Sequence, residues 1–131
     1  MTPGEVAVEA ARSLIGNAFE WNSADPKVGI SCGGLIVYAW RAAGVALPLA
    51  EGDAKTAALL YETLPQVDRA DVAPGDVLFL YRIQDPERKV VHCVIHTGRG
   101  RMIEATQPGV QPERDVPAHY WARLAGIGRP G

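Results

Sequence analysis

Cys32 and His92 are the two residues whose types and surroundings could support nucleophilic chemistry. Cys32 stands between Ser31 and two glycines, where a segment rich in Asn, Asp and Pro gives way to a helical pattern. A thiol in the first turn of a helix faces unpaired backbone N–H groups and the positive end of the helix dipole, which both stabilise a thiolate. The N–H of Cys32 could then hold an oxyanion, since the glycines let a substrate carbonyl approach. An unreactive buried cysteine at a helix start fits the same position.

His92 and Glu104 fall in two segments, 90–97 and 101–106, which we expect to form a β-hairpin around Gly98 and Arg99. Such a turn sets Glu104 roughly opposite His92, with the Cβ atoms about 5 Å apart. A carboxylate bound to one imidazole nitrogen fixes the tautomer and leaves the other nitrogen for the thiol, as in a Ser-His-Asp triad. A solvated His–Glu pair is the alternative, and the position of Cys32 favours catalysis.

The alternation of side chains along a β-strand predicts where Cys93 and His96 lie relative to His92. Residues 92, 94 and 96 should share one face, and Cys93 and Ile95 the other. We therefore expect Cys93 to point away from Cys32, without a disulfide. His96 should lie about 13 Å along the strand from His92, which disfavours a zinc pair. We expect no metal and no cofactor.

The segments that must position these residues are predicted to be helices in the N-terminal part of the chain and strands in the C-terminal part. Thr2, Pro3 and Glu5 form a capping box that begins a helix, and Gly16 stops it. Further helices are expected over 34–44 and, more weakly, 54–64. Strands are expected over 77–81, 90–97 and 101–106, followed by a short segment over 118–124 and a glycine-rich tail. This order predicts an α+β fold in which N-terminal helices pack on a small antiparallel β-sheet.

Length and composition favour one globular domain over residues 1–131. The chain is 47% hydrophobic and 21% charged, with a net charge of -2 and no cluster of Lys or Arg. Nucleic acid and membrane are therefore not expected as partners, and a monomer is expected. No segment resembles a signal peptide or a membrane span. We expect free thiols and a cytoplasmic location, with a phage-associated protein or a chain trimmed of its leader as alternatives.

Three motifs resemble the NlpC-type cell-wall cysteine peptidases of the papain-like superfamily. The first runs from Ser31-Cys32-Gly33-Gly34-Leu35 to Leu47-Pro48 and is similar to the family's nucleophile helix. Pro74-Gly75-Asp76-Val77-Leu78-Phe79 is similar to its first core strand, and His92-Cys93-Val94-Ile95 to its histidine strand. Tyr120-Trp121 resembles its closing aromatic pair. The resemblance implies a papain-like domain, with Cys32 as nucleophile, His92 as base and Glu104 as the third catalytic residue.

The resemblance also implies a substrate class and a set of substrate contacts. The family's usual substrates are peptidoglycan stem peptides, cut beside gamma-D-glutamate, so a peptide or peptidoglycan fragment is the expected partner. Phe19, Trp21, Ser31 and Gly33 are the expected substrate-binding residues. Three of them depart from the family: Ser31 replaces Asp, Gly33 replaces Ser, and Phe19 replaces a tyrosine. An acyltransferase that passes the acyl group to an amine, and a non-catalytic binding or assembly module, are the alternative functions.

Overall fold

The computed structural model describes residues 1–131 as four α-helices, one short 3-10 helix and nine β-strands. The helices are α1 (Pro3–Ser13), α2 (Cys32–Ala42), α3 (Asp53–Thr63) and α4 (Ala118–Trp121), with the 3-10 turn at Arg69–Asp71. The strands are β1 (Ala24–Asp25), β2 (Gly29–Ile30), β3 (Val77–Tyr81), β4 (Val90–Gly98), β5 (Arg101–Ile103), β6 (Ala105–Thr106), β7 (Gly109–Val110), β8 (Arg114–Asp115) and β9 (Leu124–Gly128). None of the helices combines the length and the hydropathy that a membrane span requires.

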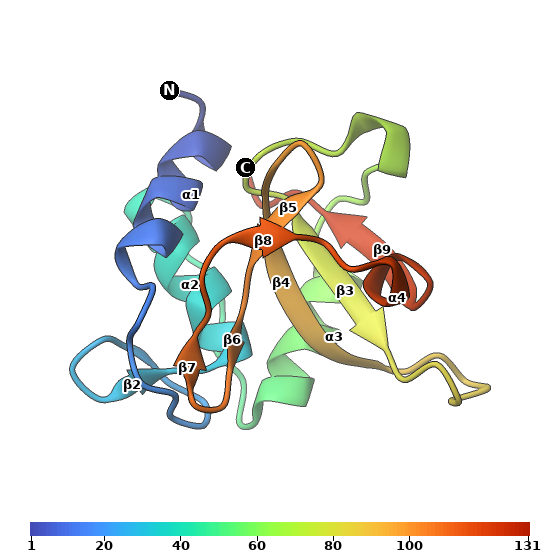
Figure 1. The fold of residues 1–131 in the computed structure, drawn as a ribbon, viewed down its shortest axis with the longest axis horizontal. Coiled ribbons are helices and arrows are strands. Elements are labelled where there is room, and N and C mark those ends of the chain that lie inside the picture. The colour runs from blue at the N-terminus through green and yellow to red at the C-terminus, as the bar shows by residue number, and fades with distance from the viewer.

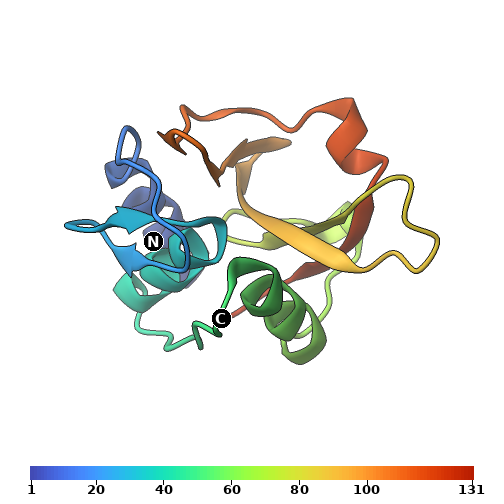
Figure 2. The same cartoon turned by 90° about the horizontal axis from the view of Figure 1, so that it is seen from below.

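A five-stranded antiparallel sheet in the order β8-β5-β4-β3-β9 forms the centre of the fold (Figure 1). α1, α2 and α3 lie on one side of it, while α4 and the chain before β3 cover the other. Figure 2 shows α3 and α4 on opposite sides of the sheet. The predicted α+β arrangement, with N-terminal helices packed on an antiparallel sheet, is confirmed.

The three longer helices form where the sequence predicts them, to within two residues at each end, whereas α4 lies in the short segment to which no structure was assigned. The capping box of α1 is present: Thr2 Oγ1 accepts from the Glu5 N–H at 3.1 Å, and Glu5 Oε1 accepts from the Thr2 N–H at 2.9 Å. α2 begins at Cys32 and buries most of its length, because it lies between α1, α3 and the sheet. Its nearly continuous apolar sequence reflects this central place.

Two apolar clusters occupy the two faces of the sheet. The cluster on the helix side contains Cys93 and Ile95 of β4, and the cluster on the other side contains Val94. The predicted alternation along β4 is therefore confirmed. Side chains of β3 divide in the same way, since Phe79 faces the helices while Leu78 and Leu80 face α4.

The register of the hairpin differs from the prediction. The turn is formed by Arg99 and Gly100, with φ of 54° and 70°, so its centre lies later in the chain than expected. Ile95 pairs with Ile103, and the register shifts between His96 and Gly98. β5 ends at Ile103, so Glu104 follows the strand and lies diagonally across from His92.

The expected strand over 101–106 and the expected glycine-rich tail also require correction. Residues 105 and 106 leave the main sheet and pair with β7 as a separate two-stranded ribbon. The tail contains β9, which pairs with β3 and completes one edge of the sheet. Gly128 suits this strand because a Cβ there would lie 3.0 Å from side-chain atoms of Leu64 and Phe79. Packing space, and not chain flexibility, explains this glycine.

Candidate active site

Ser31 holds Cys32 at the first position of α2. Ser31 is fully buried, has an extended backbone, and its Oγ accepts from the Gly34 N–H at 3.0 Å. This bond satisfies one of the free N–H groups of the first turn and leaves those of Cys32 and Gly33 without a partner inside the helix. Cys32 is 6% exposed and borders an open cleft. Its sulfur thus meets a helix N-terminus at a surface that a substrate can reach.

The cleft lies between the loop before α2, the start of α3, the first residues of β4 and the β6 segment. Its volume is about 680 Å³. A larger part of its wall is apolar, and charged side chains also line it. The lining residues include Phe19, Trp21, Cys32, Asp53, Lys55, Arg82 and His92. A cleft of this size accommodates a short peptide segment next to the thiol.

His92 and Glu104 form a short hydrogen-bonded pair beside Cys32. His92 Nε2 lies 2.9 Å from Glu104 Oε2, and the Glu104 side chain is only 2% exposed. The predicted pairing is therefore present although its register was wrong, because a glutamate side chain spans the diagonal distance between two strands. With Nε2 bound to Glu104, Nδ1 is the ring nitrogen left for Cys32.

Two residues that the sequence did not assign to the site hold Glu104. Arg114 Nη2 donates to Glu104 Oε1 at 2.7 Å, and the Tyr120 hydroxyl lies 2.8 Å from Oε2 and 3.0 Å from Oε1. Tyr120 belongs to the closing aromatic pair of the sequence motifs, but the motif did not connect Tyr120 with the catalytic residues. Nothing in the sequence around Arg114 indicated its role. Together with His92, these residues occupy both carboxylate oxygens and fix the carboxylate in one orientation.

The electrostatics of the pair favour a thiolate and an imidazolium. The neighbouring Cys93 thiol and the interaction with His92 lower the pKa of Cys32 to about 5, against burial and the negative charge of Asp53. Burial opposes the charged form of His92, but its bonds to Cys32 and Glu104 outweigh burial and raise its pKa to about 9. The charged pair is therefore the dominant form between these two values.

Glu104 stays ionised throughout that range. Burial favours its neutral form, but hydrogen bonds from His92, Arg114 and Tyr120 outweigh burial and lower its pKa to about 2. Burial and the neighbouring carboxylate raise the pKa of Tyr120 to about 12, so its hydroxyl remains a donor. The carboxylate is thus a permanent acceptor that favours protonated His92.

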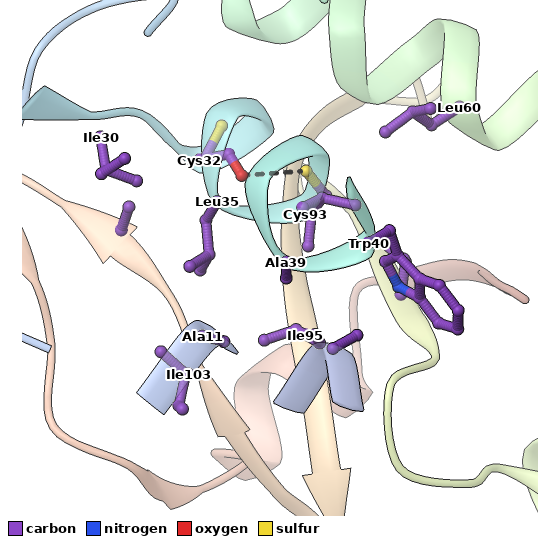
Figure 3. Close-up of a cluster of buried hydrophobic side chains, with 14 of the residues drawn as sticks. Ala11, Ile30, Cys32, Leu35, Ala39, Trp40, Leu60, Cys93, Ile95 and Ile103 are labelled. Carbon is purple, nitrogen blue, oxygen red and sulfur yellow. Dashed lines mark hydrogen bonds between the residues drawn. The ribbon is translucent and has the colours of Figure 1, made fainter. Parts of the chain in front are cut away.

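Cys93 lies against Cys32, contrary to the prediction that it points away. The alternation on β4 was assigned correctly, but the face that Cys93 takes is the face covered by α2. Its Sγ donates to the backbone oxygen of Cys32 at 3.6 Å, and the residue is fully buried (Figure 3). Both cysteines are free thiols.

The four residues expected to contact substrate divide into two groups. Phe19 and Trp21 line the cleft, with their rings edge to face and centroids 4.8 Å apart, and Trp21 is 65% exposed. Ser31 and Gly33 do not line the cleft, which corrects the expectation for them. Ser31 is the buried cap of α2, and a Cβ on Gly33 would lie 2.7 Å from Thr56 Cγ2, so Gly33 allows α2 and α3 to pack closely.

Asp53 and His96 are the remaining titratable residues of interest. Asp53 begins α3, lines the cleft and accepts from the Asn22 N–H at 3.0 Å; no pattern in the sequence indicated this place. His96 is buried away from the cleft: Nδ1 bonds to the Ala73 oxygen at 3.0 Å, and Nε2 accepts from the Gly100 N–H at 3.1 Å. The two His96 nitrogens therefore connect β4 to the segment before β3 and to the β4–β5 turn.

Comparisons with known proteins identify the family that the chain matches. The model of the NlpC/P60 family matches residues 16–127. The bifunctional muramidase/DL-endopeptidase CwlT of Bacillus subtilis is 25% identical over 95% of this chain and 36% of its own length. The gamma-DL-glutamyl hydrolase of the same organism is 28% identical over 92% of the chain and 28% of its own length. The chain thus spans about a third of the length of these relatives.

Solved structures share the fold at low sequence identity. NlpC1 of Trichomonas vaginalis superposes with a TM-score of 0.79 at 19% identity, covering 98% of this chain and 44% of its own. RipD of Mycobacterium tuberculosis superposes with a TM-score of 0.74 at 22% identity, covering 98% of both chains. RipD is described as a non-catalytic NlpC/p60 domain protein adapted to peptidoglycan binding. The fold therefore occurs with and without catalysis.

Proposed function

Because the chain belongs to the NlpC/P60 family, we propose that it is a cysteine hydrolase that cleaves an amide or isopeptide bond through a thioester on Cys32. One observation carries the proposal: Cys32 begins a helix at the cleft, beside a histidine whose Nε2 lies 2.9 Å from a buried carboxylate. Members of this family are generally cysteine peptidases. The arrangement supports activity because a binding module needs neither an activated thiol nor an oriented histidine.

The reaction begins with the Cys32 thiolate and the His92 imidazolium already formed. The sulfur attacks the carbonyl carbon, and the N–H of Cys32 donates to the oxygen that becomes negative. His92 then gives its proton to the departing nitrogen, the C–N bond breaks, and a thioester remains on Cys32. Water, deprotonated by the now neutral His92, attacks the thioester carbon, and the C–S bond breaks, which releases the acid and restores the Cys32 thiolate and the His92 imidazolium. Glu104 holds the ring and stabilises its protonated form throughout.

We propose peptidoglycan stem peptides, cut at a gamma-D-glutamyl bond, as the substrate class. The names of two relatives support this choice, since one is a DL-endopeptidase and the other a gamma-DL-glutamyl hydrolase. In the cleft, Phe19 and Trp21 offer an apolar wall, while Lys55 and Arg82 offer positive charge to substrate carboxylates. Phe19 supplies no hydroxyl, so contact at that position is apolar.

The proposal is tested by incubating the protein with a peptidoglycan digest and identifying the new fragments by mass. Hydrolysis predicts fragments with new amino termini in the wild type and none with Cys32→Ala. Repeating the digest with an added amine separates the alternative acyltransferase, because an acyl transfer to that amine yields an amide of predictable mass. Retention of uncut fragments on immobilised protein, without any cleavage, would contradict hydrolysis and indicate a binding module.

A further inference from the structure

A second hollow adjoins the cleft at Thr106 and Gln107, which line both of them. Its volume is about 460 Å³, and its walls come from the β6–β7 ribbon and from the chain that continues through β8 to α4 (Figure 1). The polar side chains that line it belong to Glu104, Thr106, Gln107, Gln111, Arg114 and Tyr120. A peptide that leaves the cleft across Thr106 and Gln107 therefore enters a polar hollow.

Arg114 lines this hollow and carries more hydrogen-bond donors than Glu104 uses. Its Nη2 donates to Glu104 Oε1 at 2.7 Å, and this is the one hydrogen bond that the guanidinium makes. Nε, Nη1 and the second hydrogen of Nη2 have no acceptor in the chain. The side chain is 50% exposed, so a ligand can reach these donors. A planar guanidinium with adjacent free N–H groups suits a carboxylate, which can accept two of them at once.

The hollow contains no carboxylate that competes for these donors. Glu104 is the one carboxylate that lines it, and its two oxygens already accept from His92, Arg114 and Tyr120. When His92 is protonated, His92 and Arg114 together carry two positive charges, and Glu104 neutralises only one of them. An anion that enters the hollow therefore meets a cation whose charge is not fully compensated.

We propose that the second hollow is a subsite for a carboxylate of the substrate, which Arg114 binds through the N–H groups that Glu104 leaves free. This inference rests on the proposed function, since it names a part of the same peptide substrate that lies away from the scissile bond. A stem peptide offers two such groups. One is the α-carboxylate of D-glutamate, which the gamma linkage leaves free, and the other is the carboxylate at the C-terminus of the peptide.

The other cations of this region do not replace Arg114. Lys55 and Arg82 line the cleft but not the hollow, whereas Arg114 lines the hollow but not the cleft. Arg123 lies over the Tyr120 ring, 5.4 Å from its centroid, and does not line the hollow. A carboxylate in the hollow therefore meets Arg114, and a second carboxylate in the cleft can meet Lys55 or Arg82.

The test measures peptide affinity by isothermal titration calorimetry in the Cys32→Ala protein, which cannot form a thioester. The probe is the tetrapeptide L-Ala-gamma-D-Glu-L-Lys-D-Ala in three forms: with both carboxylates free, with the α-carboxylate of glutamate amidated, and with the C-terminal carboxylate amidated. Amidation of the carboxylate that enters the hollow should weaken binding about tenfold, since the charge-assisted bonds are half exposed to solvent. In Cys32→Ala/Arg114→Gln the acid and amide forms should bind with equal affinity.

The comparison of acid with amide separates a subsite from the hold of Arg114 on Glu104. Loss of that hold alone changes the affinity of every form by the same factor and leaves their ratio intact. Arg114→Lys keeps the charge but not the two-point contact, so it should retain only part of the preference, and it serves as the second variant if Arg114→Gln does not melt cooperatively. Arg101→Gln is the matched control, because Arg101 is 45% exposed, pairs with Asp115 and does not line the hollow. It should leave the preference unchanged.

The outcomes for the subsite and for the hydrolase are distinct. A preference for the acid form that persists in Arg114→Gln would assign the carboxylate to another cation and overturn the subsite. Equal affinity of all three peptide forms for Cys32→Ala would also overturn it, and cleavage by the wild type would then leave the hydrolase proposal intact. A preference that depends on Arg114, together with no cleavage by the wild type, would support the subsite and contradict the hydrolase.

Discussion

Replacing Glu104 by glutamine removes a charge from the active site while keeping an acceptor for His92. Glu104 Oε2 lies 2.9 Å from His92 Nε2, and the carboxylate is 2% exposed, so solvent screens the pair little. A hydrogen bond to a charged group is worth about 1.5–3 kcal/mol, which corresponds to about one to two pKa units. The pKa of His92, about 9 in the wild type, should therefore fall by that amount in Glu104→Gln.

The assay is the pH dependence of kcat/KM on a cleaved stem peptide. Its acidic limb follows Cys32 and its alkaline limb follows His92, because the active form is the thiolate with the imidazolium. Glu104→Gln should move the alkaline limb down by about one to two units and leave the rate near pH 6 within a few fold of wild type. Glu104→Ala, which also loses the orienting acceptor, should lose much more rate at every pH.

Glu113→Gln is the matched control for Glu104→Gln. Glu113 is also an arginine-paired carboxylate, bonded to Arg12 and Thr97, but it does not contact His92. Its replacement should leave both limbs in place. An alkaline limb that stays at the wild-type pH in Glu104→Gln would refute the electrostatic role of Glu104. Wild-type behaviour of Glu104→Ala would reduce the site to a Cys–His dyad.

Three further perturbations follow from the same geometry. Asp53→Asn removes the charge that opposes the thiolate, so the Cys32 pKa, read by alkylation, should fall; a rise would contradict the charge argument. Gly34→Ala brings a Cβ within 1.8 Å of the Ser23 oxygen, and this clash should reduce the free energy of unfolding, measured in urea, by about 1–3 kcal/mol or more. Gly44→Ala has nothing within 4 Å of the new Cβ, so only its φ of +84° should reduce the free energy of unfolding, by about 1 kcal/mol. Finally, the raised pKa of His92 contributes stability below pH 6.5 that is lost as the pH rises through 9, and the lowered pKa of Cys32 contributes with the opposite slope. Wild type should thus show a nearly flat melting temperature between pH 6.5 and 9; a steep fall over that range would contradict the ion pair, because Cys32 would then not offset His92.

The sequence predicted most of the elements and the central contacts of the site. Caps and periodicity located α1, α2 and β3 because local signals determine them: a capping box at Thr2 and a short apolar run bounded by a turn. Cys32 and His92 could be paired because the helix start and the strand each restrict a side chain to a small region.

The features that could not be predicted from the sequence depend on contacts between segments that are distant along the chain. The pairing of β9 with β3 is set by packing against Leu64 and Phe79, and its glycines resemble a flexible tail. Alternation divided the faces of β4 correctly, but only the placement of α2 shows that Cys93 faces Cys32. Arg114 and Tyr120 reach Glu104 from a segment that has no regular pattern, so their roles appear only when the chain is folded.

The most direct test of the account is intact-mass analysis during rapid mixing of the protein with a gamma-D-glutamyl stem peptide. If Cys32 is the nucleophile, the mass of the protein should rise transiently by the acyl portion of the peptide, located on Cys32, and return to its starting value as the free acid forms. Cys32→Ala should show neither the adduct nor the product. Release of product by Cys32→Ala at the wild-type rate, or an acyl adduct on another residue, would contradict Cys32 as the nucleophile.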